Sequence, residues 1–200
     1  MILGRSDSVI SAVPPETIPV VIILVSIVAF TIIIERMIFF WNIRKLTQEE
    51  ITLIKNLLRS NQPEEAVMYA QKIPSPVSKV LAFGIESRIR GNSIDNEFLD
   101  ESYRQVSIME KFLNGLGTIA TIAPLLGVLG TVLGIIRSFE AGAGTKGAEV
   151  GISEALITTA MGLAVAIPAY IFYNYFINKK DSFIGEIENV TSQISSLLSK

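Results

Sequence analysis

The chain contains neither cysteine nor histidine. Disulfide scaffolds, thiol or imidazole catalysis and Cys/His metal sites are therefore excluded. Its charges nearly cancel, with 17 Lys and Arg against 19 Asp and Glu, so the overall charge gives no reason to expect nucleic acid as a partner. No nucleophile with a neighbouring base is visible, and we expect no enzyme and no cofactor.

Long uncharged stretches dominate what is present. Half of the residues are hydrophobic, which is too many for an ordinary soluble domain. A helix needs about 20 apolar residues to cross a bilayer, and three segments meet this need: 17–42, 112–137 and 153–178. The first is too long for the apolar region of a signal peptide, so we expect it to be retained. The sequence predicts an all-α membrane protein with three transmembrane helices.

Lysine and arginine predict the orientation, because loops rich in them stay on the cytoplasmic side. Ten of them lie in residues 43–111, and Lys179 and Lys180 open the tail at 179–200. We therefore expect the loop 43–111 and the tail to be cytoplasmic. The short N-terminal segment 1–16 and the connector 138–152 are then periplasmic, in a multi-pass protein of the inner membrane.

The cytoplasmic parts are predicted to be helical. Pro124 is the only helix breaker between residues 93 and 136, so we expect the second span to begin inside the cytoplasm and to continue without interruption into the membrane. The third span should mirror it. The tail has a coiled-coil-like seam, with an amphipathic helix resting on the bilayer as the alternative. The seam residues are Phe183, Ile187, Val190, Ile194 and Leu197.

The connector AGAGTKGAEVG, residues 141–151, superficially suggests a phosphate-binding loop. A Walker A loop requires Ser or Thr directly after its lysine, whereas Gly147 follows Lys146 here. We interpret the connector as a hairpin turn.

Small residues recur at every third or fourth position of the second and third spans. One interpretation is close helix packing, since Gly130 and Gly134 form a G-x-x-x-G motif. The other is that these stripes line a shared central space. The stripe residues are Gly117, Ala120, Pro124, Gly127, Thr131 and Gly134 in the second span and Ala155, Thr159, Gly162, Ala166 and Ala169 in the third.

Three polar residues of these spans are expected to lie at similar depths in the membrane. Thr131 and Thr159 each lie 14 residues from a turn near Thr145, so they should share one level. Glu154 lies about one turn further out, where a carboxylate is tolerated more easily than at the bilayer centre; it is alternatively an interface residue favoured by the helix dipole. The runs 112–136 and 155–178 hold no acid or base. The chain therefore cannot relay protons through the bilayer centre without a partner that supplies the titratable group.

Two stretches, APLLGVLGTVLGI (123–135) and GISEALITTAMGLAVAIPAYIFYNYF (151–176), resemble the TolQ/ExbB family of inner-membrane motor subunits, relatives of MotA within the MotA/TolQ/ExbB proton channel family. The resemblance implies a homo-pentamer in membrane lipid around a dimer of a single-span TolR/ExbD-type partner. A partner aspartate inside the pore would carry protons, and the motor would couple the proton motive force to work on the periplasm or outer membrane, as in biopolymer and protein transport.

Particular residues match the family motifs. Thr131 and Thr159 match its pore threonines and Glu154 matches its pore carboxylate, so the resemblance implies a proton pathway along these three. Arg36, with the acid before it, matches a pair near the inner end of the first span, which we interpret as a simple anchor. Leu133 stands where many members have tryptophan, a difference expected to affect packing. The short N-terminal segment, unlike the long periplasmic extension of some ExbB proteins, favours TolQ or an unassigned paralogue. The alternative function is a non-conducting membrane scaffold whose small-residue stripes serve oligomer packing only.

Overall fold

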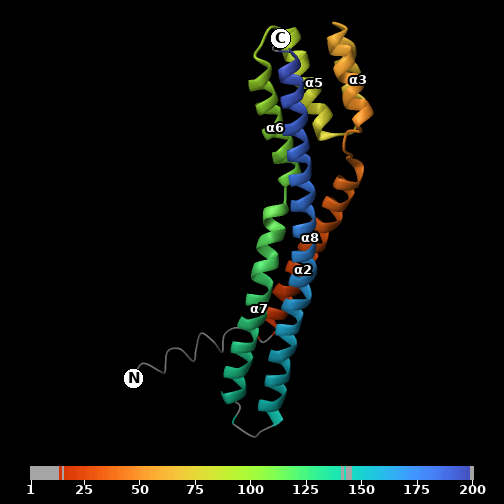
Figure 1. Ribbon diagram of the computed structural model, residues 1–200. Coiled ribbons are helices and arrows are strands. Elements are labelled where there is room, and N and C mark those ends of the chain that lie inside the picture. The colour runs from red at the N-terminus through yellow and green to blue at the C-terminus, as the bar shows by residue number, and fades with distance from the viewer. Residues whose placement is uncertain (1–13, 15, 141, 143–145, 199–200) are drawn as a thin grey trace. The chain divides into compact units, whose positions relative to one another are not determined.

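The structure is a computed structural model that describes residue 14, residues 16–140, residue 142 and residues 146–198. Most of the predicted N-terminal segment and part of the predicted connector lie outside these residues. The described chain is helical and contains no strand. Its helices, coloured along the chain in Figure 1, are α2 (Thr17–Asn42), α3 (Gln48–Arg59), α4 (Pro63–Gln71), α5 (Pro76–Ile89), α6 (Ile94–Glu110), α7 (Leu113–Glu140) and α8 (Lys146–Leu198).

Three apolar helical segments are long enough to cross a membrane. They are α2 with 26 residues, the α6–α7 segment Ile94–Glu140 with 47 residues, and α8 with 53 residues. Large apolar side chains such as Leu24 and Ile27 of α2 are more than half exposed, which is typical of a surface that faces lipid. The predicted all-α class with three apolar spans is confirmed, and α8 runs as one helix from the connector through the tail.

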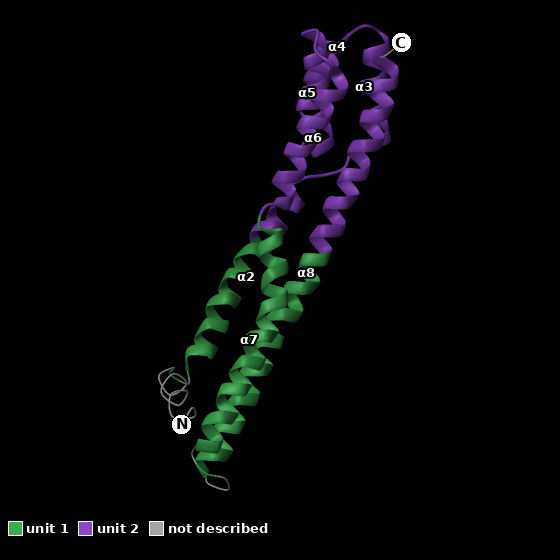
Figure 2. Ribbon diagram, turned by 90° about the vertical axis from the view of Figure 1, so that its left-hand side faces the viewer, with its two compact units in different colours: residues 1–34, 112–174 green, residues 35–111, 175–200 purple. Residues whose placement is uncertain are grey.

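The chain divides into two compact units, coloured separately in Figure 2. The hairpin unit comprises residues 1–34 and 112–174, and contains α7 with the adjoining parts of α2 and α8. The loop unit comprises residues 35–111 and 175–200, and contains α3 to α6 with the remainder of α2 and α8.

The second apolar segment is not one continuous helix, contrary to our expectation. α6 ends at Glu110 and α7 begins at Leu113. Phe112, between them, has φ of 64°, a left-handed conformation that is uncommon for a bulky residue. This conformation ends the α6 hydrogen-bond ladder, so the terminal carbonyls of α6 need other donors.

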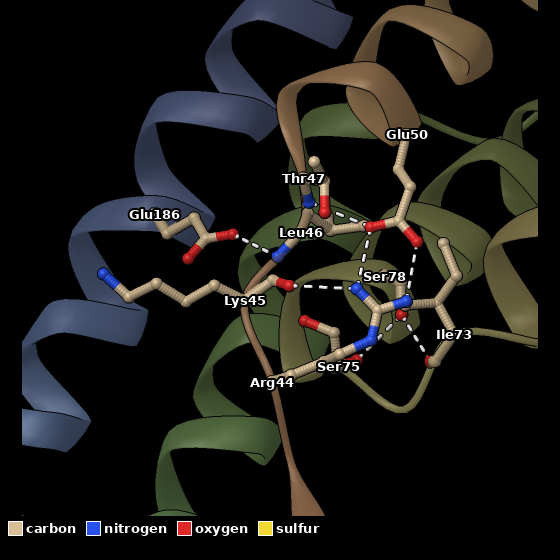
Figure 3. Close-up of polar contacts among 9 residues, drawn as sticks. All are labelled: Arg44, Lys45, Leu46, Thr47, Glu50, Ile73, Ser75, Ser78 and Glu186. Atoms are coloured by element: carbon tan, nitrogen blue, oxygen red, sulfur yellow. Dashed lines mark hydrogen bonds and ion pairs between the residues drawn. The ribbon is translucent and has the colours of Figure 1, made fainter.

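In the loop unit, the start of α3 is fixed by polar contacts (Figure 3). Glu50 accepts hydrogen bonds from Nη1 and Nη2 of Arg44, at 2.9 and 2.6 Å, and from the Thr47 N–H at 2.9 Å. These donors lower the pKa of Glu50 to about 2. The N–H of Leu46 donates to the carboxylate of Glu186 in α8 at 2.8 Å, which ties the tail to this junction.

The seam of the tail is buried within the loop unit. Phe183, Ile187, Val190 and Ile194 are at most 2% exposed, and Leu197 at the end of the seam is half-buried. Side-chain hydrogen bonds flank the seam: Ser195 of the tail donates to Asp95 of α6 at 2.5 Å, and Lys55 of α3 donates to Gln193 of the tail. The seam therefore packs inside the chain, and an amphipathic helix resting on the bilayer does not describe it.

Candidate functional site

The two threonines expected to share a level meet across the α7–α8 hairpin. The hydroxyl oxygens of Thr131 and Thr159 lie 2.7 Å apart. The Thr159 hydroxyl donates to the carbonyl oxygen of Gly127 at 3.0 Å, and the Thr131 hydroxyl lies 3.1 Å from the same oxygen. These distances are within the normal range for hydrogen bonds. Two hydroxyls and one carbonyl thus converge at one point of an otherwise apolar hairpin.

Two glycines allow this approach. A Cβ atom on Gly127 would lie 3.0 Å from the Cα atom of Thr159. A Cβ atom on Gly162 would lie 2.5 Å from the carbonyl oxygen of Ala123. Both neighbours are backbone atoms, which cannot rotate away as a side chain can. The backbones of α7 and α8 are therefore in direct contact, and the threonine pair depends on that contact.

The other predicted small-residue positions lie mostly in helix contacts of the hairpin unit. Gly134 faces Ala155, whose Cβ atom would lie 2.6 Å from an added Cβ. Gly130 faces the side chains of Thr158 and Ile18. Close packing within one chain therefore accounts for much of both stripes. Ala120, Ala123, Ala155, Ala166 and Ala169 are buried, and Thr131 and Thr159 are half-buried.

The threonine pair lies on the side of the hairpin turned away from α2. Ile18 of α2 would be 3.2 Å from a Cβ on Gly130, and Ile32 would be 3.9 Å from one on Gly115. A helix rotates about 100° per residue, so Thr131 lies about 100° around α7 from Gly130 and about 160° from Gly115. This face of the hairpin is free of α2.

Glu154, the third residue of the predicted pathway, is not brought together with the pair. Glu154 precedes Thr159 by five positions, which corresponds to a rotation of about 140° around α8. Glu154 instead lines a pocket of about 290 Å³ at the turn end of the hairpin, together with Arg137 and with Ile18 of α2. The nearby Thr158 is buried, and its hydroxyl donates to the Glu154 carbonyl at 2.9 Å.

Arg36 has a role that the sequence did not reveal. Its side chain is 2% exposed and forms an ion pair with Glu35. Its guanidinium donates to the carbonyl oxygens of Ile108 at 3.0 Å and Met109 at 3.5 Å, and lies 4.5 Å from the ring centroid of Phe39. Arg36 thus caps the carbonyls released where α6 ends. The sequence feature that could have indicated this role is the position of Arg36 within an apolar helix, because an arginine there requires buried hydrogen-bond acceptors.

The described part of the chain offers no metal site, since it contains no group of three or more acidic side chains able to hold an ion. The predicted absence of titratable groups from the hairpin core also limits the chemistry. The threonine pair can donate and accept hydrogen bonds, but it cannot itself take up or release a proton near neutral pH.

Comparison with known proteins gives a family match. A family model described as the MotA/TolQ/ExbB proton channel family matches residues 59–189, more than half of the chain. An ExbB-like biopolymer transport protein of Synechocystis sp. is 32% identical over 181 residues, covering 84% of this chain and 84% of the relative. The biopolymer transport protein ExbB of Salmonella typhimurium is 31% identical over 194 residues, covering 90% of this chain and 79% of the relative.

A second group of similar proteins carries a different name. The Tol-Pal system protein TolQ of Haemophilus influenzae is 35% identical over 100 residues. This match covers 48% of the present chain and 44% of the relative. Similarity therefore extends to both the ExbB and the TolQ proteins.

Proposed function

Because the chain belongs to the MotA/TolQ/ExbB proton channel family, we propose that it is the channel subunit of an inner-membrane motor that couples the proton motive force to work on the periplasm or outer membrane. It is a multi-pass membrane protein of a transport family and not an enzyme. Proteins of the ExbB and TolQ type generally work with ExbD or TolR partners. We propose such a single-span partner here, with a membrane aspartate that carries the proton.

The observation that carries this proposal is the threonine pair. Thr131 and Thr159 place two hydroxyls 2.7 Å apart, on the face of the hairpin that α2 leaves free. A polar pair at this depth is useful to a partner that brings a carboxyl group, because a buried carboxyl needs hydrogen-bond partners in both of its protonation states.

The pair is suited to both states. When the Thr159 hydroxyl donates to the Gly127 carbonyl and the Thr131 hydroxyl donates to the Thr159 oxygen, a lone pair of Thr131 is available to accept a hydrogen bond from a protonated carboxyl. When the carboxyl is ionised, one hydroxyl can turn to donate to it while the other keeps its bond to Gly127. The exchange moves only hydroxyl hydrogens, so it requires no backbone movement.

The energies involved make the hydroxyls necessary. An unsatisfied buried polar group costs about 1 to 3 kcal/mol. One charge that crosses the membrane yields about 2.3 kcal/mol per 100 mV. The loss of one hydroxyl therefore removes a large part of the driving force of the cycle.

We further propose the assembly and orientation that fit this role. Five copies surround a partner dimer, with the N-terminus periplasmic and the loop unit and tail cytoplasmic. Glu154 then lies near the periplasmic end and attracts protons towards the pathway. Native mass spectrometry should give five copies of the chain, and a closed dimer or trimer as the sole species would contradict this.

A non-conducting scaffold is the second candidate, and the direct backbone contact at Gly127 and Gly162 favours it. The two functions differ in what valine does at the threonines. Thr131→Val and Thr159→Val keep the shape and remove the hydroxyl. Thr31→Val in α2 is the matched control, because the Thr31 hydroxyl also donates to a carbonyl of its own helix, at 2.8 Å, away from the pair.

The experiment measures proton uptake by right-side-out membrane vesicles that contain the chain and its partner, together with the oligomer mass of each variant. We expect Thr131→Val and Thr159→Val to abolish uptake at unchanged oligomer mass, and Thr31→Val to conduct like the parent. If all three variants conduct like the parent, the threonines are packing residues and the proposed pathway is refuted.

A further inference from the structure

The hairpin unit has a second polar region that lies nearer the loop end of the spans than the threonine pair. A groove of about 530 Å³ lies between α7 and α8. Five of its seven lining residues carry polar side chains, although all lie in segments apolar enough to cross a membrane. The lining residues are Asn114, Gly117, Thr118, Thr121, Ile122, Tyr170 and Tyr173.

Gly117 opens the groove. A Cβ atom on Gly117 would lie 2.9 Å from Cε2 of Tyr173, so the tyrosine ring lies directly on the backbone of α7. This places the Tyr173 ring in the α7–α8 contact, whereas a tyrosine of an interfacial aromatic belt faces lipid. Tyr170, one turn away, is 61% exposed. The two rings therefore flank the groove on its α8 side.

The polar groups of the groove require a polar neighbour. Thr118 and Thr121 donate to carbonyls one turn earlier in α7, at 2.8 and 3.0 Å, which satisfies their hydroxyl hydrogens. Within the part of the chain that the structure describes, the hydroxyls of Tyr170 and Tyr173 and the side-chain amide of Asn114 make no hydrogen bond to protein. Lipid chains cannot satisfy such groups, whereas water can.

The groove lies on the same face as the threonine pair. On α8, Tyr170 and Tyr173 follow Thr159 by 11 and 14 residues, which puts all three within about 60° of arc around the helix. On α7, Thr121 and Asn114 precede Thr131 by 10 and 17 residues, and the three span about 100°. Both sets lie on the side that α2 leaves free, so one continuous face of the hairpin carries both the threonine pair and the groove.

Pro124 leaves one backbone carbonyl of α7 without its helical donor. Thr121 and Thr131 are ten residues apart, a rise of about 15 Å. Proline has no N–H, so the carbonyl of Ala120 receives no hydrogen bond from position 124 within α7. This carbonyl oxygen, one residue before Thr121, is left without its usual donor in α7.

From these observations we infer that the groove holds water and forms the inner half of the proton pathway, between the threonine pair and the loop end of the spans. The volume corresponds to on the order of ten to twenty water molecules at about 30 Å³ each. This inference rests on the proposed function for the flow of protons. The presence of water in the groove can be tested without it.

The first test measures water access. The chain has no cysteine, so single cysteines can be introduced without background. Thr121→Cys places a thiol in the groove. Thr31→Cys places one on α2 nearer the loop end than Thr121, because the neighbouring Ile32 lies beside Gly115 of α7. A charged, membrane-impermeant methanethiosulfonate reacts with thiolate, which forms in water and not in lipid. In inverted vesicles, we expect Thr121→Cys to react at least about tenfold faster than Thr31→Cys. Equal, slow reaction of both would overturn the inference, because lipid or a second copy of the chain would then cover the groove.

The second test measures conduction through the groove. Tyr173→Phe and Thr121→Val each remove one hydroxyl, and we expect each to lower proton uptake about fivefold or more, which is the rate equivalent of one lost hydrogen bond. Tyr175→Phe is the matched control, because the Tyr175 hydroxyl bonds Lys179 and lies outside the groove. If the groove variants conduct like the parent while Thr131→Val does not, the groove is no part of the pathway and the proposed function stands. If the parent with its partner takes up no protons, the proposed function fails, and thiol reactivity still reports whether the groove is wet.

Discussion

The contact between α7 and α8 can be tested with a single methyl group. In Gly162→Ala, the added Cβ would lie 2.5 Å from the Ala123 carbonyl oxygen and 3.1 Å from the Cα atom of Gly127. Neither backbone atom can move without a shift of the whole helix. Gly185→Ala is the matched control, because Gly185 lies in the same helix and a Cβ there meets nothing within 4 Å.

The two substitutions should have opposite signs. Alanine in place of glycine inside a helix stabilises by about 1 kcal/mol, and this gain applies to both positions. At Gly162, overpacking costs about 1 to 3 kcal/mol, and the backbone neighbours favour the upper part of that range. We therefore expect Gly162→Ala to destabilise by up to about 2 kcal/mol and Gly185→Ala to stabilise by up to about 1 kcal/mol.

The assay is thermal unfolding of the purified protein in detergent. For a chain of 200 residues, 1 kcal/mol shifts the Tm by about 2 to 4 °C. Gly162→Ala should lower the Tm by several degrees, and Gly185→Ala should raise it by up to about 2 to 4 °C. If Gly162→Ala raises the Tm as much as Gly185→Ala does, the two backbones are not in contact, and the reasoning for the threonine pair is wrong.

Three further predictions concern the loop unit. Arg36→Met should lower the stability measured in a thermal melt by about 1 to 3 kcal/mol, because two α6 carbonyls lose their donor. Arg36→Lys should not restore this stability, since lysine lacks the planar guanidinium fork. An Arg36→Met variant as stable as the parent would contradict the capping role. Ser107→Pro should cost about 3 kcal/mol and impair assembly, and normal assembly would mean that α6 is dispensable. Because the pKa of Glu50 is lowered to about 2 by Arg44, its stabilisation is present above about pH 4.5 and is lost as the pH falls towards 2. The Tm difference between parent and Glu50→Gln should shrink over that range, and a difference independent of pH would refute the ion pair.

The sequence was sufficient to predict the three spans and the shared level of Thr131 and Thr159. Hydrophobic length identifies membrane helices, because the bilayer imposes it on each helix separately. A hairpin also relates residues at equal distances from its turn, so the shared level follows from counting. Both inferences depend only on local geometry, and the 2.7 Å contact agrees with the second.

The neighbours of Glu154 on α8 and the break between α6 and α7 could not be predicted from the sequence. A count of residues gives the depth of Glu154 but not its neighbours, and the structure turns it towards the pocket that Ile18 also lines. Phe112 is neither glycine nor asparagine, so the sequence carries no signal for its left-handed conformation. That conformation accompanies a cap on α6 supplied by Arg36, more than 70 residues earlier in the chain. Such a contact depends on tertiary packing, which local sequence patterns do not report.

The central claim is that the chain provides hydrogen-bonding groups for proton transfer while its partner provides the titratable acid. Proton uptake by liposomes tests this most directly, with the chain alone, with the chain and its partner, and with a partner whose membrane aspartate is changed to asparagine. The runs 112–136 and 155–178 hold no acid or base, so we predict uptake only for the chain with the unaltered partner. Uptake by the chain alone at the rate of the complex, or by the complex with the asparagine partner, would contradict the claim.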